Sequence, residues 1–419
     1  MTRDRTDWTG VAFGVGLACL AAYQQFKLPP VLPAMLDSYG YDLTVAGAFM
    51  SVYAIAGLLL SWPIGRLLHR AGAARLLYAT FAAMLAGNLL VLAWPADSGL
   101  VLAARGLEGV AFAVCAIAGP TLANLAAARR HFGIVVGLTA AWIPIGQLAA
   151  ALLAPIALAA GRWQWLWAAA VLATVAMMLW TRALERRRRL DFGGGAPEPS
   201  APADPGFAGG FAEARAGSAQ RRRLPLLLAA AIFMLWSGQY FAYMTWLPQY
   251  LVAAHGLSER SAVAGYALPV AVLLLFNLLT GVGLRLGLSV RHLLVAALLS
   301  QAAVWWLAPV TGSGATGVLS LVAYGIGAGI TPTCLFALPS VLRGPAGAAR
   351  AFGVLMTGRN LGVLVGPVLF AAASKSAGGW HAAVPLFAAG TTLAVVAALC
   401  LYPMLTPRAT GAGAQGTRR

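Results

Sequence analysis

Long apolar runs constrain this chain more than any other feature of its sequence. A helix that crosses a membrane needs roughly 20 mainly apolar residues, and runs of that kind recur along the whole chain. We expect twelve helices, over 9–36, 43–65, 74–95, 98–126, 132–159, 163–183, 225–253, 261–284, 290–310, 315–342, 351–374 and 380–404. Only 10% of the residues are charged, against about 25% in soluble chains. The sequence therefore predicts an all-α membrane protein.

The positions of the basic residues give these helices a direction. The net charge is +17, and most of the 29 Lys and Arg lie in the two terminal segments and in alternate loops. The remaining loops hold only Arg162, Arg260 and Lys375. Because loops rich in Lys and Arg stay in the cytoplasm, we expect a multi-pass protein with both termini cytoplasmic. The expected location is the plasma membrane, which in a bacterium is the inner membrane, and no nucleic-acid partner is expected.

The chain divides into two related halves around its one long polar segment. Residues 185–222 are rich in Gly, Pro and Ala, which predicts a cytoplasmic linker between helical bundles at 1–184 and 223–406, with a tail at 407–419. Matches recur at corresponding places: Phe132 with Phe352, Gly109 with Gly329, Gly146 with Gly366 and, approximately, Gln24 with Gln239. Two six-helix halves in the same orientation predict a substrate site near the middle of the bilayer, between the halves.

A loop motif after the second expected helix makes the chain resemble the major facilitator superfamily. The segment GRLLHRAGAARLL resembles the family pattern G-x-L-x-D-R-x-G-R-R-x-x-L, with matches or close substitutes at Gly65, Arg70, Gly72 and Arg75. His69 stands at the usual aspartate, which puts that residue's salt bridge in doubt. The resemblance implies two pseudo-symmetric six-helix bundles and a secondary active transporter. It also implies a conformational role for the loop motif.

Two further segments extend this resemblance. RGLEGVAFA resembles the family's R-x-x-x-G pattern at Arg105 and Gly109, and YFAYMTWLPQYL (Tyr240–Leu251) is similar to the seventh helix of cyanate-type and related anion permeases. Antiporters of the family often carry a Gly-Pro pair in the fifth helix, where this chain has Pro144 and Gly146 separated by an isoleucine. This departure weakens the interpretation as a drug-efflux pump.

Ionisable side chains inside the apolar runs mark the candidate site, because a charge at the bilayer centre costs about 2.5–3.5 kcal/mol. Arg359 lies about 12 Å along the eleventh helix at 1.5 Å per residue, next to Asn360. We expect both to contact an anionic substrate, although Arg359 could instead hydrogen-bond neighbouring carbonyls.

Three further charged residues and one amide lie in the first half. Arg105 and Glu108 are three residues apart and can pair on one helix face. Glu108 is either the proton carrier or half of a permanent ion pair, and Arg105 is a candidate substrate contact. Lys27 and Gln24 are also three apart. Lys27 either contacts the substrate with Gln24 or extends to the outer interface.

The seventh expected helix carries aromatic and amide side chains on one face. Trp236, Gln239, Tyr240 and Tyr243 are spaced at i, i+3, i+4 and i+7. Such a stripe either packs in the core or lines a central cavity, and its position favours the cavity. Trp142 and Asn277 are weaker candidates.

Three basic residues and one acid inside the membrane predict a positive cavity that favours a small anion. The leading hypothesis is a monomeric, proton-coupled secondary transporter for such a solute. A proton-coupled multidrug efflux pump, or a non-transporting receptor or assembly factor on the same fold, are the alternatives. No P-loop, HExxH motif or metal-ligand spacing occurs. We therefore expect neither an enzyme nor a cofactor.

Overall fold

The chain folds into helices throughout its described part. The computed structural model describes residues 5–70, 73–187, 216–376 and 379–405, and some side chains within these ranges, including those of 60–70 and 343–350, lie outside the description. The first half contains α1 (Trp8–Phe26), η1 (Pro29–Val31), α2 (Leu32–Tyr39), α3 (Leu43–Arg70), α4 (Ala73–Ala93), α5 (Ser98–Ala126), η2 (Arg129–His131), α6 (Phe132–Ala140), α7 (Trp142–Ala159) and α8 (Trp165–Arg186). The second half contains α9 (Ala216–His255), α10 (Glu259–Arg285), α11 (Val290–Leu307), η4 (Ala308–Val310), α12 (Ala315–Ser376), α13 (Trp380–Leu401) and η5 (Tyr402–Leu405).

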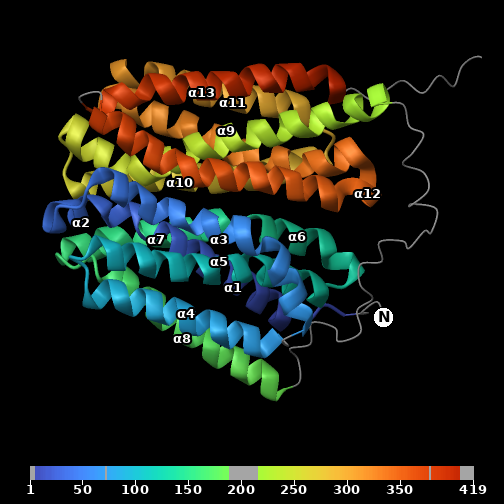
Figure 1. Cartoon of the computed structure of the whole chain (residues 1–419), viewed down its shortest axis with the longest axis horizontal. Coiled ribbons are helices and arrows are strands. Elements are labelled where there is room, and N and C mark those ends of the chain that lie inside the picture. Colours follow the sequence, from blue (N-terminus) through green and yellow to red (C-terminus); the bar gives the residue numbers. More distant parts are fainter. Residues whose placement is uncertain (1–4, 71–72, 188–215, 377–378, 406–419) are drawn as a thin grey trace, which may run out of the picture.

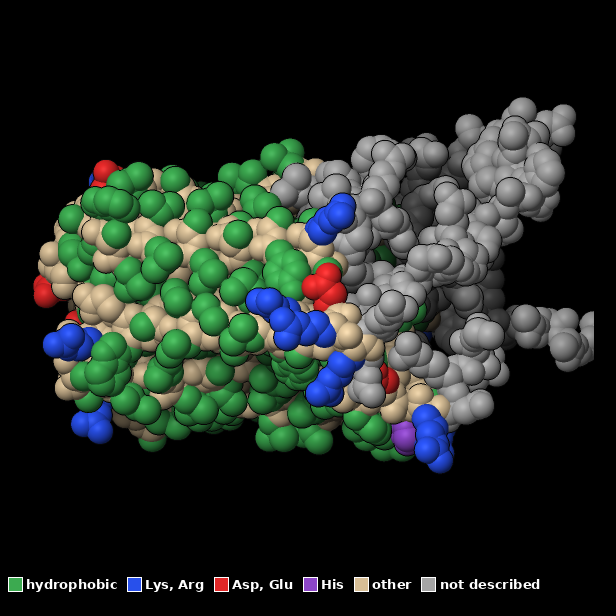
Figure 2. Space-filling view, turned by 90° about the horizontal axis from the view of Figure 1, so that it is seen from below, with side chains coloured by type: hydrophobic (Ala, Val, Ile, Leu, Met, Phe, Trp, Pro, Cys, Tyr) green, Lys and Arg blue, Asp and Glu red, His purple; other side chains and the backbone are tan. Residues whose placement is uncertain are grey.

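The two halves form two bundles that lie against each other. The helices from α1 to α8 occupy one side of the molecule and those from α9 to α13 the other, with the axes running along its longest dimension (Figure 1). Apolar side chains cover the lateral face seen in Figure 2, and charged side chains gather toward its two ends. An apolar flank between polar ends is the surface that a lipid bilayer requires.

Eleven helical runs in the described part of the chain are long and apolar enough to cross a membrane. A further apolar helix, Leu43–Leu59, is the first part of α3, which continues to Arg70. These runs correspond in order to the twelve predicted helices, so the predicted fold class is confirmed.

Helix α12 contains two of the predicted spans. Its 62 residues would measure about 93 Å if straight, roughly three times the hydrocarbon thickness. The rings of Phe336 and Phe352 nevertheless stack with centroids 5.8 Å apart, whereas 16 residues of straight helix would separate them by about 24 Å. The chain therefore turns back between these two residues. Residues 315–339 and 351–376 form two separate crossings, as the sequence predicts.

Prolines explain where two predicted helices are interrupted. The backbone of Pro30 has no N–H to donate to the carbonyl of Phe26, and α1 ends at Phe26. Pro144 likewise leaves the carbonyl of Ala140 without its helical donor, and α6 ends at that residue before α7 begins. The predicted helix 9–36 is therefore built from α1, η1 and α2, and the predicted helix 132–159 is built from α6 and α7.

The internal repeat appears as matched helix contacts. A Cβ atom added to Gly146 of α7 would lie 2.4 Å from the carbonyl oxygen of Cys19 in α1, and one added to Gly366 of α12 would lie 2.1 Å from that of Gly238 in α9. Gly109 packs in the same manner against Tyr53 of α3, and Gly329 against α10. Paired glycines thus permit the same close helix contacts in both halves.

The linker and the loop motif are only partly described. Helix α8 continues to Arg186 and α9 begins at Ala216, so both helices extend into the predicted linker 185–222, whose residues 188–215 lie outside the description. Of the loop motif, Gly65, His69 and Arg70 belong to α3 without described side chains, and Gly72 lies outside the described residues. Arg75 is an exposed residue of α4. The conformational role of this motif stays a prediction.

Candidate functional site

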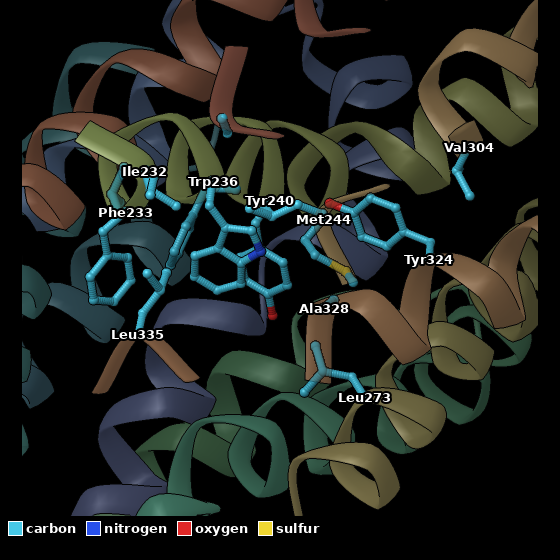
Figure 3. Packing of buried hydrophobic residues seen from close by; sticks show 14 of the residues in the cluster. Ile232, Phe233, Trp236, Tyr240, Met244, Leu273, Val304, Tyr324, Ala328 and Leu335 are labelled. Carbon is cyan, nitrogen blue, oxygen red and sulfur yellow. The ribbon is translucent and has the colours of Figure 1, made fainter. Parts of the chain in front are cut away.

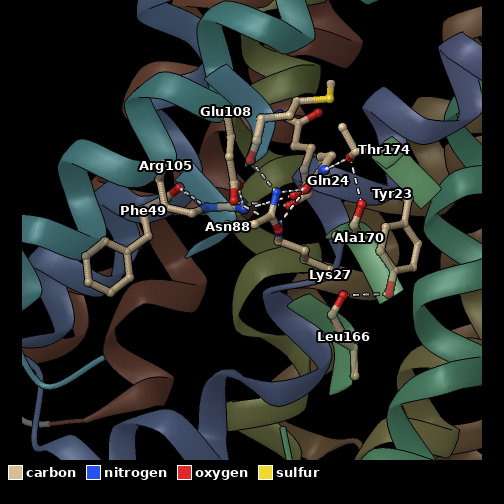
Figure 4. A network of polar contacts seen from close by, with 12 residues as sticks. Tyr23, Gln24, Lys27, Phe49, Asn88, Arg105, Glu108, Leu166, Ala170 and Thr174 are labelled. Atoms are coloured by element: carbon tan, nitrogen blue, oxygen red, sulfur yellow. Dashed lines mark hydrogen bonds and ion pairs between the residues drawn. The ribbon is translucent and has the colours of Figure 1, made fainter. Parts of the chain in front are cut away.

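A buried carboxylate, Glu108 of α5, is the centre of a charged network in the first half (Figure 4). Its Oε1 atom accepts a hydrogen bond of 2.8 Å from Lys27 Nζ, and its Oε2 atom accepts from Arg105 Nη1 at 2.6 Å and from the hydroxyl of Tyr53 at 2.6 Å. The side chains of Lys27, Arg105 and Glu108 are completely buried. The predicted pairing of Arg105 with Glu108 is confirmed, and the three ionised groups together carry one positive charge.

Arg105 also completes the end of helix α1. Pro29 has no N–H for the carbonyl of Gln25, and Arg105 Nη2 donates to that oxygen at 2.9 Å. Arg105 Nη1 donates to the carbonyl of Gln24 at 2.8 Å, and Nε donates to that of Phe49 in α3 at 3.2 Å. A cation at a helix C-terminus interacts favourably with the helix dipole. Arg105 therefore joins three helices and uses its donors within the protein.

Lys27 faces inward with Gln24, as their spacing predicts. Its ammonium donates to Gln24 Oε1 at 2.5 Å and to Asn88 Oδ1 of α4 at 2.5 Å, in addition to Glu108. Its Nζ atom also lies 4.8 Å from the ring centroid of Trp167. All three ammonium hydrogens thus have acceptors, and Lys27 does not extend to the membrane surface. Helices α4 and α5 can approach this closely because Gly87 has no side chain beside Glu108.

The second half has a neutral network at the corresponding place, and two of its donors, Trp236 and Tyr324, lie among the buried hydrophobic residues shown in Figure 3. Gln239 Oε1 of α9 accepts from Trp305 Nε1 and from the Tyr324 hydroxyl, both at 2.8 Å. Gln301 Oε1 accepts from Trp236 Nε1 at 3.1 Å. The amide nitrogens of Gln239 and Gln301 are buried, and neither has a hydrogen-bond partner among the described residues. This network therefore retains unused donors.

A polar bridge crosses between the halves beside these networks. Gln147 of α7 accepts a 2.8 Å hydrogen bond from the Tyr240 hydroxyl of α9, and its amide nitrogen donates at 3.0 Å to Tyr266 of α10. The rings of Phe26 in α1 and Phe241 in α9 stack nearby across the same boundary, with centroids 5.6 Å apart. We call this group of five residues the central seam. It lies between the halves, where the repeat predicts the substrate site.

Arg359 lies beside the central seam on α12. Its guanidinium carbon is 5.5 Å from the ring centroid of Phe241, and Nη1 donates to Asn360 Oδ1 at 3.0 Å. No carboxylate in the described part of the chain forms an ion pair with it, and the residue is only 8% exposed. Asn360 in turn packs against Gly57 of α3, so both residues lie where the halves meet.

The structure sorts the predicted site residues into separate groups. Gln24, Lys27, Arg105 and Glu108 lie together, whereas Arg359 and Asn360 are not joined to them by any hydrogen bond or ion pair given for the described residues. Trp236 stacks on Tyr240 at 5.1 Å, and Tyr243 stacks on Tyr324 at 3.5 Å. Of the weaker candidates, Trp142 contacts Phe112 and Asn277 donates to Thr333.

Sequence reasoning missed several residues that complete these groups: Tyr53, Asn88, Gln147, Tyr266, Gln301 and Tyr324. Isolated amides inside apolar runs, such as Asn88 and Gln147, are the signal that could have revealed some of them. Among the described residues, no group of three His, Cys, Asp or Glu side chains is placed to hold a metal ion.

Comparisons with known proteins identify related sequences and folds. The family model described as Major Facilitator Superfamily matches residues 14–355. No curated protein matches the chain. A crystal structure of the nucleoside transporter NupG, in a mutant form, is similar with a TM-score of 0.69 and 15% identity, and the match covers 93% of this chain and 100% of that chain. At this identity the similarity shows the fold alone. These matches give no support to the resemblance of Tyr240–Leu251 to cyanate-type permeases.

Proposed function

The chain belongs to the major facilitator superfamily and is a secondary transporter rather than an enzyme, and we propose that it carries a small anionic solute by alternating access, coupled to protons. We further propose that it acts as a monomer in the plasma membrane with both termini cytoplasmic, as the distribution of Lys and Arg favours. The bundles 1–184 and 223–406 would then rotate about the central seam.

The observation that carries the anion proposal is that Arg359 is buried without an ion-pair partner among the described residues. An isolated buried charge costs several kcal/mol, and proteins normally compensate it with a counter-charge. Arg359 donates a hydrogen bond to Asn360 Oδ1 and lies beside an aromatic ring, but it has no paired carboxylate in the described part of the chain. A bound anion would supply the missing charge, with Arg359 and Asn360 as its direct contacts.

The central seam supplies the remaining contacts of the proposed site. The Tyr240 hydroxyl now donates to Gln147, and it can donate to an anion instead when the halves separate. Phe26 and Phe241 provide aromatic surface on either side of the boundary. This combination favours a small organic anion with some apolar surface, such as a carboxylate, over a cationic drug.

We propose that Glu108 carries the coupled proton. The carboxylate accepts from Lys27, Arg105 and Tyr53, and protonation would remove the attraction that holds Lys27 to α5. Gln24 belongs to α1 and Lys27 directly follows it as the C-cap residue, and α1 also carries Phe26 of the central seam. A change at Glu108 would therefore reach the proposed substrate site through a single helix.

The test is uptake into proteoliposomes under an imposed pH gradient, across a panel of carboxylates and inorganic anions. A nucleoside and a cationic amphipathic drug complete the panel, to represent the solute named for the structural neighbour and the efflux alternative. We expect accumulation of at least one anion, a loss of at least tenfold in R359Q, and partial retention in R359K. Transport of the drug but of no anion would contradict the proposal, as would unchanged anion uptake in R359Q.

A further inference from the structure

A cavity of about 400 Å³ lies inside the second bundle, away from Arg359. Its aromatic walls are Tyr243, Trp246, Tyr250, Trp305 and Phe370. The α-helical lining residues come from the last turns of α9 and α11 and from the first turns of α10, α12 and α13, and Phe370 comes from the last turns of α12. The cavity is therefore at the end of the bundle opposite to the start of α1 and to the end of α13 (Figure 1).

This cavity is distinct from the proposed pathway between the halves. Every residue that lines it lies between positions 243 and 384, so α1 to α8 contribute none of the described lining. The central seam and Arg359 do not line it either. Packed protein interiors leave few voids larger than a water molecule, and ligand sites typically measure about 300–1,000 Å³. The size thus matches a small-molecule site formed by the second half alone.

The lining indicates the chemistry of the occupant. No Lys, Arg, Asp or Glu occurs among the described residues that line the cavity, and His255 is its one imidazole. The Tyr250 hydroxyl is buried and has no hydrogen-bond partner within the described chain. A buried hydroxyl left unpaired costs about 1–3 kcal/mol. An occupant with a single polar group could pair with that hydroxyl while its ring contacts the aromatic walls.

We propose that this cavity is a second binding site, which takes an uncharged aromatic molecule with one hydrogen-bonding group. The site connects to the transport machinery through two wall residues. Tyr243 stacks on Tyr324, and Trp305 donates to Gln239, the amide of α9 one residue before Tyr240 of the central seam. Helix α9 carries both Gln239 and Tyr240. If Tyr240 contacts the substrate as proposed above, an occupant that moves these rings should also change the rate of transport.

The test measures binding of 1-naphthol to the purified full-length protein in detergent by equilibrium dialysis, a readout that does not depend on transport. Ser320 lines the cavity, whereas Leu319 beside it is 69% exposed. We expect S320W to weaken binding at least tenfold and L319W, the matched control, to leave it unchanged. We expect Y250F, which keeps the ring, to weaken binding about threefold to tenfold through the lost hydrogen bond.

Two results would overturn this proposal. One is binding of 1-naphthol by S320W and Y250F with the affinity of the unmodified protein. The other is complete displacement of 1-naphthol by added phospholipid at low mole ratio, which would identify an acyl chain as the occupant. Because binding is measured without a gradient, failure here leaves the proposed anion transport untouched.

Discussion

Gln24 in the first half and Gln239 in the second lie at related positions of the repeat, yet their surroundings differ in charge. Gln24 accepts from Lys27, within a network that contains three ionised side chains. Gln239 accepts from the neutral donors of Trp305 and Tyr324. The shared glycine contacts show that this difference does not come from the backbone arrangement. The same scaffold therefore holds an ionic network in one half and a neutral network in the other.

The two networks also differ in how completely they are satisfied. In the first half, the ammonium of Lys27 and the guanidinium of Arg105 have acceptors for their hydrogens. In the second half, the amide nitrogens of Gln239 and Gln301 have no partner among the described residues. Breaking a complete ionic network is costly, whereas a neutral network with free donors can rearrange at smaller cost.

The largest effect is expected for E108A. Removing the carboxylate leaves Lys27 and Arg105 buried without a counter-charge, and breaking a buried pair in this manner costs about 3–5 kcal/mol. The midpoint of unfolding in mixed detergent should fall accordingly. The double variant K27M/E108Q removes one charge of each sign and should recover part of this loss. An E108A protein as stable as the unmodified chain would show that the network is not an ionic one.

The next largest effect is expected where the repeat packs most closely. In G366A the new methyl carbon would lie 2.1 Å from the Gly238 carbonyl oxygen, and in G146A 2.4 Å from that of Cys19. Overpacking of this kind costs about 1–3 kcal/mol. Both substitutions should lower thermal stability, as measured by a thermal shift in detergent. G390A is the matched control, because no atom lies within 4 Å of the added carbon. Equal losses of thermal stability in G366A, G146A and G390A would contradict the conclusion that the two halves pack equivalently at Gly146 and Gly366.

A smaller effect is expected for Q239L. The substitution leaves the donors of Trp305 and Tyr324 unpaired, which costs about 1–3 kcal/mol, but it also removes an amide nitrogen that is already unpaired. We therefore expect the loss of unfolding free energy to fall in the lower part of that range, below the loss in E108A. A loss in Q239L that equals or exceeds the loss in E108A would reverse the contrast between the halves.

The smallest effect is expected at the exposed ion pair that joins the halves. Lys375 Nζ of α12 lies 2.5 Å from Asp42 Oδ2, just before α3, and the Lys375 ammonium and the backbone N–H of Thr44 hold the pKa of Asp42 at about 2. Exposed pairs contribute about 0.2–1 kcal/mol, so K375Q should cost less than about 1 kcal/mol.

The pH dependence of this pair has a definite sign. The folded pKa of Asp42 is below the ordinary value near 4, so the contribution is present above about pH 4 and is lost as the pH falls toward 2. The difference in unfolding midpoint between K375Q and the unmodified protein should accordingly vanish in acid. A difference that persists at pH 2 would show that Lys375 stabilises the protein without Asp42.

Much of the fold could be predicted from the sequence, because apolar length, loop charge and the repeat are local patterns. The pairing of Arg105 with Glu108 followed from their spacing on one helix. The orientation of Lys27 and Gln24 toward the same side followed in the same way. Spacing within a helix says nothing about which helix lies opposite. For this reason Asn88 and Tyr53 could not be assigned to the network in advance.

Because spacing within a helix does not show its neighbours, the prediction of a positive cavity was also incomplete. The sequence places Lys27, Arg105 and Arg359 in the membrane, but only packing shows that the first two are already neutralised in part by Glu108. Arg105 also satisfies a carbonyl that Pro29 leaves free. That relation requires knowledge of how α1 and α5 lie against each other. Arg359 is thus the basic residue of this set that best fits a substrate contact.

The most direct test of the account compares E108Q with R359Q in proteoliposomes, using an anion that the unmodified protein accumulates. Two rates are measured for each variant: accumulation driven by a pH gradient, and counterflow exchange without a gradient. If Glu108 couples transport to protons and Arg359 binds the anion, E108Q will lose gradient-driven accumulation and retain counterflow exchange, whereas R359Q will lose both. Gradient-driven accumulation in E108Q, or normal counterflow in R359Q, would contradict this division between the halves.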